Sequence, residues 1–466
     1  MAAVATLLIL SRSPARPALP TPVQVAVSVD TRSPGPPVPR AFLGLSFEMS
    51  SLRLISTYSP NGSFVGLLRS LGSGVLRFGG VSADTRVAWE DAATPLPSWT
   101  SQGLDAGELR AVARLARASG WPVVLTLGLA HYDVRAAARE ASAAERAFGP
   151  RLEGIEIGNE PDAYGHHGLR SEPWTPARYA AELRAYQHAI ARVAPGVQFL
   201  GPDVSGSLAF ATWGSQAARQ ARLAQLTGHH YPLGCHQVPA PTITRLLSPT
   251  IRVLEEDSLH RYMSISRSEG LGFRMDETNT VSCGGKDGIS DTFASALWAV
   301  DYITSAMQAG VAGINLQGNP ANCRGYSPVC AASPQSLAAG KLTAQPIFYA
   351  LLLTRELIGD RPLLSTVHAP KGLNIAVHAL LAPDGGLRIV LVDNEPPASR
   401  PVRVSLNLGK GFERASEISL SAPTQQARSG VTLGGETMGA DGRWRAPASS
   451  PELPDHDGLL TLTLPA

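Results

Sequence analysis

Residues 155–163 of the chain read IEIGNEPDA. An apolar, strand-like run ends here in Asn159, Glu160 and Pro161, so a carboxyl group follows the run with an amide before it and a turn-forming proline after it. Residues 273–277 read FRMDE, and this run also ends in a carboxyl group, that of Glu277. Two glutamates therefore stand at the ends of two strand-like runs that are far apart in the sequence.

Strand-like and helix-like runs alternate between residues 40 and 360. The runs with strand character are residues 42–49, 75–80, 122–129, 152–161, 198–205, 226–231, 272–279 and 310–318. Apolar side chains at helical spacing mark residues 106–118, 176–193, 291–308 and 346–359, the third of which opens with an N-cap signal at Ser290 and Asp291. Residues 123–127, VVLTL, are almost continuously apolar, as parallel strands covered on both faces are. The pattern predicts an α/β fold, a (β/α)8 TIM barrel, with functional side chains at the carboxyl ends of its strands. Glu160 then ends the fourth strand and Glu277 the seventh.

The pattern changes after Gly359. Short alternating runs follow at residues 373–379, 387–392, 402–408, 431–434 and 459–464, with turn signals such as PDGG at residues 383–386 between them. They predict a C-terminal β-sandwich over residues 360–466, after a barrel over residues 37–359. Residues 22–36 are expected to add an N-terminal strand to that sandwich and to end in a proline-rich linker. Residues 1–21 are expected to be a signal or a disordered leader.

Composition and charge narrow the classes of partner. The chain has 466 residues, of which 44% are hydrophobic and 17% charged, as in a globular protein with a large core. The net charge is only +2 and no long run of Lys and Arg occurs, so no nucleic-acid partner is expected. No stretch has the roughly 20 apolar residues that a membrane span needs. We expect a monomer.

Four cysteines lie late in the barrel: Cys235, Cys283, Cys323 and Cys330. They form no C-x-x-C pair, which argues against a zinc site. One or two disulfides in an oxidising compartment are favoured, with the pairing open and four thiols in a cytoplasmic enzyme as the alternative. Apolar residues 2–10 resemble the core of a secretion signal without its basic start. We therefore expect a secreted or periplasmic protein, with the cytoplasm as the alternative.

Two carboxyl groups at the mouths of two strands fit the cleavage of a glycosidic bond. The leaving oxygen needs a proton and the anomeric carbon gains positive charge, and a pair of carboxyl groups serves both needs without metal or organic cofactor. We assign Glu160 as the acid/base and Glu277 as the nucleophile of a retaining glycosidase, with Asn159 beside the acid to hold a sugar hydroxyl. A lone glutamate at a strand end is more often a solvated or capping residue, but the pair on strands four and seven favours catalysis.

Several segments, in order along the barrel, resemble glycoside hydrolase family 79, the heparanases and β-glucuronidases, in their bacterial single-chain form. They are residues 76–80 (LRFGG), 156–161 (EIGNEP), 229–231 (HHY), 277–285 (ETNTVSCGG) and 289–294 (ISDTFA). The resemblance implies a barrel with a β-sandwich, and a β-glucuronidase acting on heparan sulfate or another glucuronate-containing acidic polysaccharide. It also implies that Glu160 is the proton donor and Glu277 the nucleophile.

The resemblance assigns substrate contacts as well. The backbone N–H groups of Gly284 and Gly285 would bind the uronate carboxylate, because glycine lets the backbone approach an anion closely. Glu48 would bind sugar hydroxyls, and the backbone of Gly80 would line the same pocket. His230 would touch the sugar, Tyr231 would bond to Glu277, and Tyr326 would contact the carboxylate. The alternative for the histidine and the tyrosine beside it is a place in the core.

The chain departs from the resemblance at three places. Cys283 stands where heparanase has a glycine, Phe348 where it has a carboxylate-binding tyrosine, and residues 127–128 (LG) where it has an asparagine.

Three other functions stay open: an arabinofuranosidase or xylosidase of the same clan, an exo-acting β-glucuronidase, and a glycan-binding protein without catalysis. The sequence leaves endo and exo action undecided.

Overall fold

The computed structural model describes residues 21–92, 96–396, 399–408, 414–447, 452–453, 455–456 and 459–464. The leader expected at residues 1–21 lies outside the described residues except for residue 21. None of the described helices is long and apolar enough to cross a membrane.

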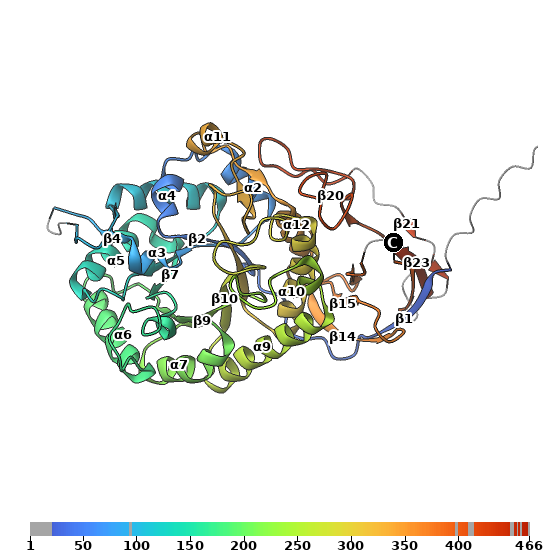
Figure 1. The fold of residues 1–466 in the computed structure, drawn as a ribbon, viewed down its shortest axis with the longest axis horizontal. Coiled ribbons are helices and arrows are strands. Elements are labelled where there is room, and N and C mark those ends of the chain that lie inside the picture. The colour runs from blue at the N-terminus through green and yellow to red at the C-terminus, as the bar shows by residue number, and fades with distance from the viewer. Residues whose placement is uncertain are drawn as a thin grey trace, which may run out of the picture.

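Parallel strands form an eight-stranded barrel at the centre of the larger part of the molecule (Figure 1). In spatial order they are β7 (Leu152–Ile157), β6 (Val123–Leu127), β3 (Val75–Gly79), β2 (Leu43–Glu48), β11 (Gly313–Gly318), β10 (Phe273–Thr278), β9 (Gln225–His230) and β8 (Leu200–Val204). Between β7 and β8 only one isolated bridge, Ile155 to Phe199, closes the ring. Each strand coincides with one of the predicted runs, so the (β/α)8 prediction is confirmed.

Helices surround the barrel on its outer side (Figure 1). The longer ones are α4 (Ala106–Ser119), α5 (Val134–Phe148), α6 (Pro176–Ala191), α7 (Ser207–Gln220), α9 (Pro249–Ser268), α10 (Phe293–Ala309) and α12 (Pro346–Thr354). Local sequence sets their ends. Helix α4 starts at a capping box of Asp105 and Glu108 and stops at Gly120, which has a φ of 85°. Helix α6 starts at Thr175, whose side chain accepts from Arg178 N, with Pro176 in the first turn.

A second module stands beside the barrel and contains a seven-stranded sheet. Strand β1 (Val23–Asp30) runs parallel to β17 (Val402–Asn407) and antiparallel to β14 (Arg361–His368), so both ends of the chain share this sheet. The first residues of β14 instead pair with β15 (Ile375–Leu381). The remaining strands of the sheet are β16 (Leu387–Asp393), β22 (Asp455–His456) and β23 (Leu459–Leu464). Valines of β1 and β17 pack with residues of β15 and β16, which places the apolar core between the two halves of the sheet.

The second module also touches the helix that follows the Glu277 strand. The first backbone N–H groups of α10, those of Phe293 and Ala294, donate to the carbonyl oxygens of Ala427 and Gln425 at 2.8 Å each. The cap predicted at Ser290 and Asp291 is wrong, because the N-cap residue is Thr292 and its side chain makes no capping bond. The first N–H groups of any helix have no acceptor within the helix. For α10, carbonyl oxygens of the second module supply these acceptors.

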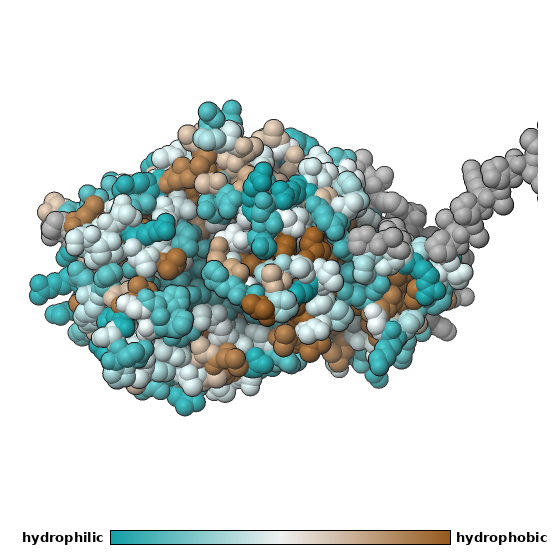
Figure 2. Space-filling model, in the orientation of Figure 1, coloured by the Kyte–Doolittle hydropathy of each residue, from teal (hydrophilic) through white to brown (hydrophobic). Residues whose placement is uncertain are grey.

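Apolar side chains on the face shown in Figure 2 form small groups between polar ones. The described part of this face has no broad apolar surface. The large apolar residues are instead inside, where one continuous core joins the barrel, its helices and part of the second module.

The two modules also meet at a glycine of helix α2, where a larger side chain would not fit. Gly66 lies in α2 (Ser63–Ser70), and a Cβ there would come within 2.2 Å of the carbonyl oxygen of Asp441. We expect Gly66→Ala to destabilise the protein by about 1–3 kcal/mol, because the backbone of the second module would have to move. Urea unfolding measures the change.

Gly272→Ala is the matched control, because a Cβ there meets only ordinary contacts at 3.7 and 3.8 Å. Equal stability of the two variants would show that α2 and the second module do not pack as described.

Candidate active site

A buried arginine stands at the centre of the barrel's carboxyl end. Arg77 of β3 is completely buried and reaches four carboxyl groups. Its Nη2 lies 2.7 Å from Asp203 Oδ2, its Nη1 2.8 Å from Glu277 Oε2, and its Nε 2.9 Å from Glu156 Oε2 and 3.5 Å from Asp276 Oδ2. Burial disfavours its charge, but the surrounding carboxylates, Asp203 foremost, raise the pKa of Arg77 well above its usual value. Arg77 is therefore a permanent cation that fixes the positions of these acids.

Glu160 follows β7 in a conformation that is unusual for its type. Its φ of 50° and ψ of 53° are left-handed, and its backbone N–H donates to Asp203 O at 2.8 Å. Pro161 then starts a short 3-10 helix. The turn leaves the Glu160 side chain 29% exposed, the most accessible carboxyl group of the cluster. A backbone held in a rare conformation at a strand end is typical of functional sites.

Glu277 is held by both of its oxygen atoms. Arg77 donates to Oε2, and the hydroxyl of Tyr231 donates to Oε1 at 2.8 Å. The side chain is 9% exposed, so it is not completely closed off from solvent. Burial and the negative charge of Glu277 raise the pKa of Tyr231, which keeps its proton on the bond to Glu277. Glu277 is thus a fixed carboxylate, and the predicted bond from Tyr231 is present.

The two glutamates face each other. Glu160, His229 and Glu277 each offer one side-chain atom within 4.8 Å of the atoms of the other two. His229 Nδ1 lies 2.9 Å from Glu160 Oε1, while its Nε2 lies 2.7 Å from Asp203 Oδ1. Such a set could also ligate a cation, but Arg77 already contacts Glu277 and Asp203. A chain of contacts thus runs from Arg77 through Asp203 and His229 to Glu160.

The two histidines of residues 229–231 point to opposite sides of strand β9. His229 points into the barrel, while His230 points outward, where its ring stacks on Tyr302 of α10 at 5.2 Å between centroids. His230 Nε2 lies 3.4 Å from Glu255 of α9. Successive residues of a strand face opposite sides, so only one of two neighbouring histidines can reach the cluster. The structure brings His229 to Glu160 and does not bring His230 there.

Glu48 and Gly80, which the resemblance places in one pocket, lie together beside this cluster. Ser82 donates its backbone N–H to Glu48 Oε2 at 2.9 Å, and its hydroxyl binds the same oxygen. Gly80 has a φ of 71°, and a Cβ there would lie 2.6 Å from the Glu48 carboxyl group. Burial and the charge of Glu277 raise the pKa of Glu48. Only glycine at position 80 leaves room for this carboxyl group.

Asn159 is fixed from two sides. Its Oδ1 accepts from Arg77 Nη2 at 3.1 Å, and its backbone N–H donates to Asp84 Oδ2 at 2.8 Å. Asp84 also accepts from the Tyr164 hydroxyl at 2.7 Å. The residue before Glu160 therefore has a set position at the edge of the cluster.

Gly284, Gly285 and Tyr326 form one wall near Glu277. Both glycines have left-handed backbone, with φ of 91° and 88°, and Tyr326 N donates to Gly284 O at 3.2 Å. The rings of Tyr326 and Tyr231 stack at 5.7 Å between centroids. Tyr231 thus connects this wall to Glu277, and the structure brings all four predicted residues together.

Two disulfides hold the loops around this wall. Cys235 bonds to Cys283, which joins the loop after β9 to the loop after β10. Cys323, in the loop after β11, bonds to Cys330 of the short strand β12 (Val329–Cys330). Phe348, at a position where the resemblance expects a tyrosine, is fully buried in α12 and belongs to the core.

Several cluster residues were not among the predicted site residues. They are Arg77, Glu156, Asp203, His229 and Asp276. One signal was available: a charged side chain inside an otherwise apolar parallel strand needs a partner, because a buried charge is costly alone. The sequence contains this signal in LRFG at residues 76–79 and in LGPDV at residues 200–204.

Comparison with known protein sequences finds a partial relative. No family profile matches the chain. A β-glucuronidase of Aspergillus niger is 27% identical over 175 residues, which cover 33% of this chain. The chain matches only about a third of the length of that relative, 32%.

Solved structures match over nearly the whole chain. A 4-O-α-L-rhamnosyl-β-D-glucuronidase of Fusarium oxysporum 12S has a TM-score of 0.75 at 19% identity, covering 95% of this chain and 98% of that one. A family 51 arabinofuranosidase of Xanthomonas axonopodis pv. citri has a TM-score of 0.67 at 12% identity, with coverage of 95% and 98%. A family 30 endoxylanase of Clostridium papyrosolvens C71 reaches 0.54 at 16% identity, with coverage of 95% and 97%. The fold is therefore shared with glycosidases of several families.

The central arginine gives a stability prediction. Arg77→Met leaves buried carboxyl groups without their cation, so we expect the free energy of unfolding to fall by about 3–5 kcal/mol. Urea unfolding measures it. The control is Arg219→Met, which removes an ion pair to Glu269 from an arginine side chain that is 69% exposed. That change should cost less than about 1 kcal/mol. Similar losses in the two variants would contradict the central role of Arg77.

His229 gives a pH prediction. Burial opposes its charge, but Asp203 and Glu277 outweigh it and raise the pKa of His229 well above its usual value. Protonated His229 therefore stabilises the fold below its unfolded-state pKa of about 6.5, and this contribution is lost as pH rises through the folded-state pKa. We expect the stability difference between wild type and His229→Gln to shrink as pH rises from about 6.5. Thermal unfolding across pH 6–9 measures it.

His188→Gln, on the exposed face of α6, serves as the control and should show no such trend. A wild-type minus His229→Gln difference that is constant with pH would mean that His229 is not charged in the folded protein.

Proposed function

We propose that the protein is a retaining glycoside hydrolase that cleaves β-glucuronidic linkages. The observation that carries the proposal is the pair of carboxyl groups, Glu160 and Glu277, whose oxygens lie within 4.8 Å of each other. Retaining enzymes place their carboxyl groups about 5–5.5 Å apart, whereas inverting enzymes need about 6.5–9.5 Å to fit a water molecule between them. The short separation supports double displacement.

The environments of the two glutamates suit different roles. Glu277 is a carboxylate fixed by Arg77 and Tyr231, and such a group is ready to attack an anomeric carbon. Glu160 is more exposed, as a group that must reach both the leaving oxygen and water needs to be, and its Oε1 lies 2.9 Å from Nδ1 of His229. We therefore assign Glu277 as the nucleophile and Glu160 as the acid/base.

The reaction has two steps. In the first, a Glu277 oxygen forms a bond to the anomeric carbon while the glycosidic bond breaks and Glu160 gives its proton to the leaving oxygen. In the second, Glu160 takes a proton from water, the water oxygen bonds to the anomeric carbon, and the Glu277 ester breaks. The sugar keeps its configuration, and both glutamates return to their starting states. Tyr231 stabilises the Glu277 charge at the start and the end of the cycle.

The wall near Glu277 supports the proposed substrate class. The glycines at positions 284 and 285 and the ring of Tyr326 form this surface, and the resemblance to family 79 implies that backbone N–H groups and the phenol bind a carboxylate there. The Gly285 N–H donates to Ser282 O at 3.4 Å in the structure, so we assign this role first to the Gly284 N–H. The named activities of the Aspergillus and Fusarium proteins, both glucuronidases, support the same substrate class. We propose that the substrates are glucuronate-containing acidic glycans such as heparan sulfate, cut internally, with removal of terminal glucuronate as the alternative.

The two disulfides support a secreted or periplasmic location.

The deciding experiment measures hydrolysis of 4-nitrophenyl β-glucuronide, with the arabinofuranoside and xyloside in parallel. We expect Glu277→Ala and Glu160→Ala to lose about 100-fold or more in rate, because each removes a group that takes part in the chemistry. Azide should rescue Glu277→Ala as the α-glucuronosyl azide and Glu160→Ala as the β-anomer, because azide replaces a different group in each variant.

Near wild-type turnover in both variants would refute the assignment. Preferred cleavage of the arabinofuranoside would support the related activity of the Xanthomonas protein instead, and binding of glycans without turnover would support a binding protein. Sizing of heparan sulfate products, with Glu277→Ala as the control, separates internal cleavage from release of single glucuronate residues.

A further inference from the structure

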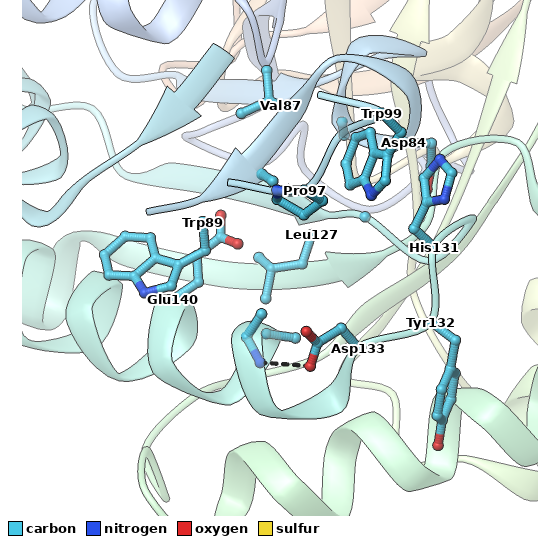
Figure 3. A pocket seen from close by; sticks show the side chains of 15 residues that line it. Asp84, Val87, Trp89, Pro97, Trp99, Leu127, His131, Tyr132, Asp133 and Glu140 are labelled. Carbon is cyan, nitrogen blue, oxygen red and sulfur yellow. Dashed lines mark hydrogen bonds between the residues drawn. The ribbon is translucent and has the colours of Figure 1, made fainter. Parts of the chain in front are cut away.

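A cavity of about 340 Å³ lies beside helix α3 (Ser82–Thr85) (Figure 3). Asp84 of this helix lines the cavity, and its carboxyl group accepts the backbone N–H of Asn159 at 2.8 Å. Ala83 and Asp84 are buried and separate the cavity from Asn159 and Glu48. The cavity is therefore not part of the proposed substrate site, whose carboxylate contacts are assigned to the wall near Glu277.

The second module contacts the loop of this wall through Arg428. The Arg428 guanidinium group donates to Asp287 Oδ1, and its Nε lies 3.1 Å from Asp291 Oδ2. Both aspartates lie in the segment between β10 and α10, shortly after the two glycines of the wall. Oδ1 of Asp291 also accepts the backbone N–H of Gly288, at 2.7 Å. Arg428 therefore bridges the two ends of residues 287–291.

The burial of Asp291 distinguishes this contact from an ordinary surface ion pair. The side chains of Arg428 and Asp287 are 46% and 49% exposed, and exposed ion pairs contribute little by themselves. The Asp291 side chain is only 2% exposed. A buried carboxylate needs a partner, because its charge is costly alone, and Arg428 is the cation that the structure places beside it. The two contacts of Arg428 therefore act as one network.

Asp287 extends the network to the third residue of the wall. Its Oδ2 lies 3.2 Å from Nη1 of Arg324, which stands two residues before Tyr326 in the loop after β11. The backbone N–H of Tyr326 in turn donates to Gly284 O. Asp287 thus lies between Arg428 of the second module and Arg324 of the tyrosine loop, so the three segments are joined at this carboxyl group.

The two glycines of the wall need such support. Gly284 and Gly285 have the greatest conformational freedom of any residue type, and a Cβ on Gly284 would meet no atom within 4 Å. Before them, Cys283 is bonded to Cys235, and after them Asp287 is held by the arginines. A backbone N–H that binds an anion acts best when its direction is fixed before the anion arrives. The disulfide and the Asp287 network fix the pair from its two ends.

We propose that Arg428 is a positioning residue for uronate recognition. Through Asp287 and Asp291 it holds the glycine pair so that the Gly284 N–H points at the uronate carboxylate. The proposal rests on the proposed β-glucuronidase function. Glu277 is fixed separately, by Arg77 and Tyr231, so the loss of Arg428 weakens carboxylate binding and spares the attack on the anomeric carbon. The second module thus takes part in the choice between a uronate and a neutral sugar.

The test compares 4-nitrophenyl β-glucuronide with the β-xyloside, which is the same sugar without the carboxylate. Arg428→Met should raise KM for the glucuronide about tenfold and leave kcat within about threefold of wild type, because binding is lost while the reacting groups are kept. For the xyloside, KM, or Ki where it acts only as a competitor, should stay within about twofold of wild type. An equal change with both sugars would overturn the proposal.

Two further variants sharpen this result. Arg32→Met is the matched control, because it removes an exposed ion pair to Asp30 at the end of β1, and it should behave as wild type. Asp287→Asn separates positioning from a direct effect of the Arg428 charge. If Arg428 positions the wall, this variant also raises KM for the glucuronide. An unchanged or lower KM would show that Arg428 does not act through Asp287, and the proposal would be wrong.

If the wild type does not hydrolyse the glucuronide, the proposed function fails on its own. The contact is then tested by hydrogen–deuterium exchange of the backbone over residues 283–291. Exchange there should be faster in Arg428→Met than in wild type and Arg32→Met, while the barrel strands exchange alike in all three proteins. Equal exchange over residues 283–291 would show that Arg428 does not hold this loop.

Discussion

The guanidinium group of Arg77 is the interaction on which the barrel's carboxyl end depends. A fully buried cation costs several kcal/mol in desolvation, and only close carboxylates can offset this cost. Arg77 meets the condition with Asp203, Glu277 and Glu156 within 2.9 Å. These acids come from different strands, so one side chain brings β3, β7, β8 and β10 into register at the point where their ends meet.

The same cation helps to give two neighbouring acids, Asp203 and Asp276, different pKa values. Burial works against a charge on Asp203, but Arg77 and His229 lower the pKa of that residue. Asp276 lies next to it without comparable bonds, and burial together with the charges of Asp203 and Glu156 raises its pKa well above the usual value. One acid of the pair is therefore ionised and the other holds a proton. This arrangement reduces the repulsion among Glu156, Asp203 and Asp276, the three acids that lie behind Glu160 and Glu277.

The sequence was sufficient for the barrel and for both glutamates, because each depends on a local pattern. Continuous apolar runs mark the strands, and Asn159-Glu160-Pro161 marks a strand end without reference to any distant residue. The partners of these residues depend on three-dimensional register, which no local pattern contains. Which of His229 and His230 faces the barrel, and that Asp203 meets Arg77, both follow from how the strands align when the ring closes. The cavity beside α3 and the pairing of the cysteines were beyond prediction for the same reason.

The start of helix α10 shows how late in the chain the site is completed. The carbonyl oxygens that accept from Phe293 and Ala294 belong to Ala427 and Gln425, more than 100 residues further on. Because a ribosome releases the chain from its N-terminus, the barrel strands are all made before these acceptors exist. The helix that follows the segment after Glu277, in which Gly284 and Gly285 lie, is therefore capped only once the second module has been made. A nascent chain stopped after the barrel would carry both glutamates yet lack this support, so the two modules form a single unit of maturation.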